Sequence, residues 1–170
     1  MSLTRNALVA FVVLVAVTAQ VAVFSLFSVN GVVPNLALIV VVAASISRGQ
    51  QFGVVVGFCA GLLIDLAPPA DHIAGRWALS LVVVAILAGR VRGDARSNAL
   101  AGLTAVAVCS FVGTSLFALS GLVLDDHALP VGQMVEVIGI AVLWDVVLAP
   151  LLLPVLLLVL ERTRAPELAF

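Results

Sequence analysis

The sequence predicts an all-α integral membrane protein with six transmembrane helices in one domain, residues 1–170. Of its 170 residues, 64% are apolar and 10% are charged, and apolar runs recur along the whole length. Soluble domains carry about 25% charged residues, so this composition excludes an ordinary soluble protein. The polar segments between the runs are short, whereas a soluble catalytic domain needs roughly 50 residues.

Turn and helix-start signals separate the apolar runs. Asn30-Gly31 predicts a turn, and Pro34 suits the first turn of a helix, where its missing N–H would have no partner. Pro150 and Pro154 predict a bend in the last helix. We expect the first run to remain as an anchor rather than to be cleaved as a signal peptide, because no polar segment opens after it. The predicted spans cover about 7–27, 34–47, 52–66, 77–89, 98–124 and 134–160.

The distribution of arginine predicts the orientation in the membrane. The chain has eight arginines, no lysine and a net charge of −1, so its charge does not indicate a basic surface for binding nucleic acid. The positive-inside tendency is satisfied when Arg76 lies outside and the other seven lie inside, so we expect a multi-pass protein with both termini cytoplasmic. The seven are Arg5, Arg48, Arg90, Arg92, Arg96, Arg162 and Arg164.

A row of small residues marks the third span. Gly53, Gly57, Gly61 and Asp65 are four residues apart, so they share one slowly winding face of a helix. Such a row lets another helix approach closely in lipid, which makes it a candidate docking surface for a partner helix. A second row lies on the fifth span and is expected to pack against the glycine row; it comprises Ala101, Ala105, Cys109 and Gly113.

Asp145 is the carboxylate predicted to lie deepest in the membrane. A carboxylate near the centre of a span costs about 2.5–3.5 kcal/mol on insertion scales, so it should face protein. We expect a structural polar contact, a contact with a partner protein, or a role in proton or ion transport. No arginine lies at a matching depth, so the expected partners within the chain are neutral: Thr18, Gln20, Ser110, Thr114 or Ser115.

The remaining polar candidates lie near the outer ends of the spans. Asp65 is expected to tether the adjacent loop, for example through Arg76, or to contact a partner. His72 and His127 are expected to be solvated rather than to bind a metal, and Cys59 and Cys109 to be buried packing residues. No nucleophile elbow, phosphate-binding loop or zinc motif occurs, so we expect neither an enzyme nor a bound cofactor or metal.

Within residues 34–90 the sequence resembles the MreD family of rod-shape-determining membrane proteins. The residues that carry the resemblance are Pro34-Asn35, Arg48, Gly53, Gly57-Phe58, Gly61-Leu62, Asp65-Leu66, Gly75 and Ala78-Leu79. Pro34, Asn35, Gly53, Gly57, Gly61, Asp65 and Gly75 match the family signature. No family motif is recognised beyond residue 100, so the interpretation of Asp145 rests on its own chemistry.

The resemblance implies a non-enzymatic scaffold of the cell-elongation and peptidoglycan-synthesis machinery (the elongasome) in the bacterial inner membrane. Its implied partners are a bitopic MreC-like protein and, indirectly, MreB, RodA and a class B penicillin-binding protein. The implied fold is similar to the substrate-binding subunits of energy-coupling-factor transporters. The alternative function is therefore a substrate-binding subunit of a vitamin-type transporter. Such subunits usually carry an Ala-x-x-x-Ala motif on the first helix to dock their coupling subunit, and the first span here lacks it, which argues against this alternative.

Overall fold

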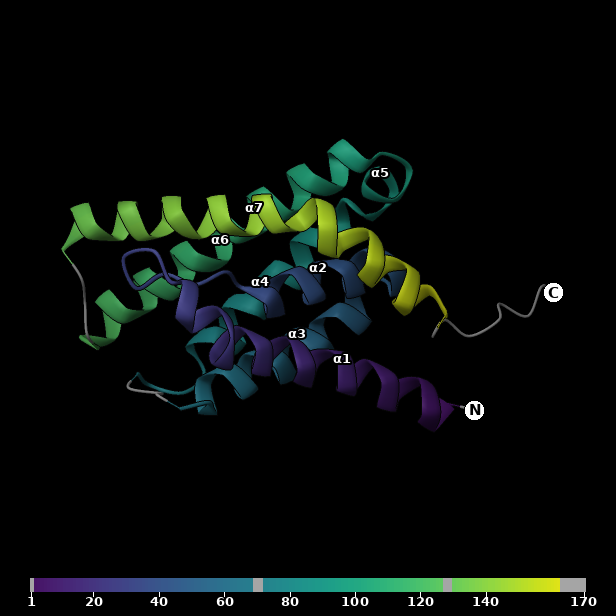
Figure 1. The fold of residues 1–170 in the computed structure, drawn as a ribbon, viewed down its shortest axis with the longest axis horizontal. Coiled ribbons are helices and arrows are strands. Elements are labelled where there is room, and N and C mark those ends of the chain that lie inside the picture. Colours follow the sequence, from purple (N-terminus) through teal and green to yellow (C-terminus); the bar gives the residue numbers. More distant parts are fainter. Residues whose placement is uncertain (1, 69–71, 127–129, 163–170) are drawn as a thin grey trace.

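The computed structural model describes residues 2–68, 72–126 and 130–162, and this part of the chain is almost entirely helical (Figure 1). Its elements in order are α1 (Ser2–Ala22), the 3₁₀ helix η1 (Phe24–Phe27), α2 (Leu36–Arg48), α3 (Gln50–Leu66), α4 (Arg76–Arg90), α5 (Arg92–Ser97), α6 (Ala99–Leu124) and α7 (Val131–Arg162).

Helix α2 forms the centre of the bundle. Every residue from 36 to 47 is buried, and α2 contacts each of the other six α-helices of the described chain. Its sequence from Leu36 to Ala44 is apolar on every face, which is the pattern of a helix surrounded by protein or lipid. The core of the molecule is therefore built around this short helix.

The length of α2 has a structural consequence. Its 13 residues extend for about 20 Å, whereas a bilayer core is about 30 Å thick. The backbone N–H of Asn35 bonds to Asp145, which lies midway along the 32 residues of α7. The first turn of α2 is therefore buried in the interior of the bundle rather than exposed at one end.

The glycine row of α3 packs against α2 and α4 of the same chain. A Cβ atom on Gly53 would collide with Ser45 of α2, and one on Gly61 would collide with the backbone at Ala78 of α4. At Gly57 a Cβ atom would lie 2.7 Å from the carbonyl oxygen of Leu81. These contacts occupy the row, so it is an internal interface and not an outer docking surface.

The predicted pairing between the two small-residue rows is wrong, because α4 packs against both helices and separates them. On α6, Gly113 faces Val84 of α4 and Leu38 of α2, and the Cys109 sulfur lies 3.8 Å from the carbonyl oxygen of Val84. Cys109 is buried as expected, but Cys59 is exposed on α3, which corrects the prediction that both thiols are buried.

The helices overlap the six ranges predicted as spans, with local differences in their bounds. Helix α2 begins at Leu36 and not at Pro34, because the side chain of Asn35 accepts a bond from the Leu38 N–H and caps the helix. The first span was predicted to reach Phe27, but α1 ends at Ala22. Residues 92–97 were predicted as loop and form α5, in which Asp94 lies in the first turn and Arg96 in the last.

Two helices, α6 and the part of α7 from Gly132 to Arg162, are long and apolar enough to cross a membrane by length and composition. Shorter apolar helices cover Asn6–Ala22, Leu36–Arg48 and Gln50–Leu66. Helix α7 contains Pro150 and Pro154 and changes direction in its last third, which confirms the predicted bend (Figure 1).

Most of the described arginines gather at one end of the bundle. Arg92 donates to the carbonyl groups of Ile46 and Ser47 at the end of α2, and Arg96 pairs with Glu161 near the end of α7. The start of α1 and the end of α7 lie on this same side (Figure 1). We call it the arginine-rich end; its arginines include Arg48, Arg90, Arg92, Arg96 and Arg162.

The tight contact at Gly57 leads to a prediction. Gly57→Leu places side-chain atoms against the backbone of α4, so we expect a loss of about 3 kcal/mol or more in the free energy of unfolding. Gly139→Leu on α7 is the matched control, because nothing lies within 4 Å of its Cβ position. Thermal unfolding in mild detergent measures both variants, and equal stability of the two would contradict this packing.

Candidate functional site

The first candidate site surrounds the start of α2. One carboxylate oxygen of Asp145 accepts a bond from the backbone N–H of Asn35 at 2.7 Å, and the other accepts from the Ser110 hydroxyl at 2.6 Å. Asp145 is fully buried. The carboxylate thus joins α7 to α6 and to the positive end of the α2 dipole, where a negative charge is favourable.

Two further side chains complete the start of α2. The Gln20 side-chain oxygen accepts from the N–H of Ala37 at 3.2 Å, and that of Asn35 accepts from the N–H of Leu38 at 3.0 Å. The first N–H groups of a helix have no partner within it, and leaving them unpaired in a dry interior is costly. We call Gln20, Asn35, Ser110 and Asp145 the α2-start cluster.

The α2-start cluster confirms part of the prediction for Asp145. The residue faces protein, and Ser110 was among its expected neutral partners. Gln20 was also expected to bond Asp145 but bonds the Ala37 N–H instead. The sequence reasoning missed Asn35 as a partner of Asp145. The donor is the backbone N–H of Asn35, and almost every residue carries such a group, so the sequence does not distinguish it.

The second candidate site surrounds the start of α4. Asp65 lies at the end of α3, with its side chain fully buried, and its two oxygens accept from the backbone N–H groups of Gly75, Trp77 and Ala78 at 2.8–3.1 Å. The same carboxylate lies 3.0 Å from Nε2 of His72. Asp65 therefore caps α4 from another helix and fixes the α3–α4 connection.

Gly75 makes this cap possible. Its φ of +103° is a left-handed conformation that favours glycine, and it turns the chain so that its N–H points at Asp65. A side chain at this position would have open space around it, so the backbone conformation and not crowding explains the glycine.

Arg76 ties α4 to the end of α6. Its guanidinium pairs with the Asp126 carboxylate at 2.8 Å, donates to the Phe117 carbonyl at 2.8 Å and to the Ser120 hydroxyl at 3.1 Å, and lies over the Phe117 ring. The Phe117 carbonyl lies within α6, which ends at Leu124, and Asp126 lies just after that helix. We call Asp65, His72, Gly75, Arg76 and Asp126 the α4-start cluster.

The α4-start cluster corrects two predictions. Asp65 does tether the adjacent loop, but through backbone N–H groups and His72, whereas Arg76 pairs with Asp126. His72 was expected to be solvated, but its side chain is 15% exposed and bonds Asp65. His127 lies outside the described residues. Within those residues, no group of three His, Cys, Asp or Glu side chains is arranged to hold a metal.

The signature residues thus have identified positions. Asn35 caps α2, with Pro34 immediately before the cap; Gly53, Gly57 and Gly61 line the α3 interface; and Asp65 and Gly75 form the cap of α4. Apart from Pro34, each of them contacts a helix or a helix start of the same chain.

Asp145 should contribute strongly to stability. Asp145→Ala leaves the Asn35 N–H and the Ser110 hydroxyl buried without an acceptor, so we expect a loss of about 2–5 kcal/mol in the free energy of unfolding. Asp145→Asn keeps one acceptor oxygen and should lose less. Glu136→Ala, an exposed carboxylate on the same helix, is the control. Thermal unfolding in detergent compares the three, and a neutral Asp145→Ala variant would refute the proposed role.

Asp65 should protect the backbone N–H groups at the start of α4 from hydrogen exchange. In Asp65→Ala the N–H groups of residues 75, 77 and 78 lose their acceptor, so hydrogen exchange in this first turn should rise at least about fivefold, as expected for a lost bond of about 1 kcal/mol. Exchange mass spectrometry measures it, with Asp94→Ala on α5 as the control. Unchanged exchange at residues 75–78 would contradict the capping role.

The comparison with protein families covers nearly the whole chain. The family model described as rod shape-determining protein MreD matches residues 2–163. This range contains both helix-start clusters and extends well beyond residue 100, where the sequence motifs alone gave no resemblance. No curated protein and no solved structure matches the chain. The match over residues 2–163 establishes that the chain belongs to the MreD family of rod-shape-determining membrane proteins.

Proposed function

We propose that this protein is a non-enzymatic scaffold of the cell-elongation machinery and that it docks the transmembrane helix of an MreC-like bitopic protein. The family match carries the proposal, because it assigns the chain a role in rod-shape determination. Through the bitopic protein, the scaffold would be connected indirectly to MreB, RodA and a class B penicillin-binding protein.

The use of polar residues in the core supports a scaffold. The buried carboxylates Asp65 and Asp145 accept bonds from backbone N–H groups of neighbouring helices, and Arg76 is held by α6 and Asp126. Such contacts fix the helices relative to one another and leave the outer apolar surface as the feature available to other membrane proteins.

The proposed topology has six spans in the bacterial inner membrane, with both termini cytoplasmic. The gathering of arginines at one end of the bundle, with Arg76 at the other, supports it through the positive-inside tendency. The short helix α2 is then enclosed by the other helices, which removes it from a bilayer that it does not match in length, whereas α3 and α4 each keep an exposed face.

The docking surface is expected on an outward apolar face, because the glycine row of α3 is occupied internally. Large exposed side chains lie on several helices, including Phe11 on α1, Phe58 on α3, Phe111 on α6 and Leu143 on α7. Each of these positions can carry a photo-crosslinking residue without disturbing the core.

Photo-crosslinking tests the docking proposal. The four positions are labelled one at a time in cells that contain the MreC-like protein, with Leu81, a large and fully buried side chain of α4, as the buried control. We expect crosslinks to the bitopic protein from one or two neighbouring faces and none from Leu81. Recovery of an ATPase module or a tightly held small molecule, in place of a bitopic partner, would contradict the scaffold and favour a transporter subunit.

A further inference from the structure

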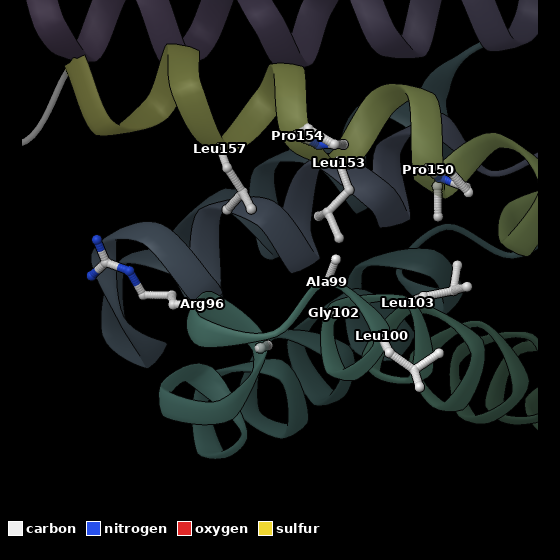
Figure 2. A pocket seen from close by; sticks show the side chains of 11 residues that line it. Arg96, Ala99, Leu100, Gly102, Leu103, Pro150, Leu153, Pro154 and Leu157 are labelled. Atoms are coloured by element: carbon white, nitrogen blue, oxygen red, sulfur yellow. The ribbon is translucent and has the colours of Figure 1, made fainter.

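A groove lies between α6 and α7 beside α5, with a volume of about 460 Å³ (Figure 2). Leu153 and Leu157 point from α7 toward α5 and α6, where Ala99 and Gly102 leave space for them (Figure 2). A Cβ atom on Gly102 would lie 3.2 Å from Leu153. Small residues on one wall and the proline bend of α7 on the other together keep the groove open.

The chemistry of this groove is asymmetric. Its walls are apolar along their length, and its charged lining residue is Arg96, which lies at one end of it (Figure 2). Arg96 pairs with Glu161 through Nη2 at 2.6 Å, and its side chain remains 32% exposed. Because a guanidinium has five N–H donors, this ion pair orients Arg96 and leaves it able to bind a further anion.

The same arrangement recurs at the arginine-rich end. A groove of about 470 Å³ between α1 and α3 has Arg48 in its lining, and one of about 240 Å³ between α4 and α6 has Arg90. A fourth groove, of about 350 Å³ between α1, α2 and α7, is lined by apolar residues alone. The described arginine-rich end therefore pairs apolar grooves with guanidinium groups, whereas the groove between α1, α2 and α7 has no charged lining residue.

We propose that the groove at Arg96 binds an anionic phospholipid, with an acyl chain along α6 and α7 and the phosphate on the guanidinium. A membrane protein's outer grooves face lipid, and basic pockets between transmembrane helices recognise anionic headgroups. Arginine suits this task because its planar fork matches the geometry of a phosphate. An anionic headgroup supplies the acceptor that complements Arg96, whereas a purely apolar helix would leave the guanidinium without one, so a lipid suits this groove.

Photolabelling of the isolated chain tests the lipid site. The chain, purified in mild detergent, is exposed to phosphatidylglycerol with a diazirine in its acyl chain and, separately, to the matching phosphatidylcholine. We expect phosphatidylglycerol to label peptides containing residues 99–103 and 150–157 more strongly than phosphatidylcholine does.

Variants separate a specific site from general attraction. Arg96→Ala should lower this labelling about fivefold, the effect of one basic residue near an anionic surface, while labelling of the uncharged groove at Phe11 and Val15 stays constant. Arg162→Ala removes the same charge from the same end and should change nothing. Ala99→Trp fills the groove from an exposed position and should abolish the labelling at residues 150–157.

Equal labelling by the two lipids, or no change in Arg96→Ala, would overturn the proposal. Loss of labelling in Arg162→Ala to the same degree would also overturn it, since the effect would then be one of overall charge. No partner protein is present in this experiment, so its outcome is independent of whether the chain docks an MreC-like protein.

Discussion

The fold depends on satisfying the first turn of α2 inside an apolar bundle. A helix start leaves N–H groups without partners, and neither lipid nor packed aliphatic side chains can accept their bonds. Gln20 from α1, Asn35 from the cap and Asp145 from α7 supply these acceptors. The helix that forms the core can therefore begin in the interior, and the contacts that allow this also position α1, α6 and α7 around it.

The start of α4 repeats the same solution with different residues. Asp65 accepts from three backbone N–H groups, and Arg76 binds the Phe117 carbonyl of α6 and the Asp126 carboxylate just after it, so the start of α4 is joined to both α3 and α6. Charged side chains in a membrane protein are expensive unless they are paired, and in both clusters the carboxylates accept bonds from helix starts. This placement explains why a protein proposed to be a non-enzymatic scaffold contains buried charged side chains.

The glycine row of α3 has a related function. In lipid, helices associate through close packing, and removing side chains from one face lets α3 approach the backbone of α4 at Gly57 and Gly61. Helix α2 is enclosed by this packing, whereas α3 and α4 each keep an exposed apolar face that includes Phe58 and Leu79. Together with the outer faces of α1, α6 and α7, these faces are available to lipid and to other proteins.

The sequence by itself determined the class of protein, the approximate helix ranges, the bend at Pro150 and Pro154 and the placement of Asp145 against protein. These follow from composition, periodicity and single residues whose burial or shape is costly, all of which are local properties. Only the tertiary structure decided what these residues contact: α4 separates the two small-residue rows, Asp65 binds backbone N–H groups rather than Arg76, and Asp145 binds the start of α2. The reason is physical, since the spacing of residues along a helix fixes which of them share a face, whereas the order in which helices pack and the backbone groups that they expose are set by the whole chain.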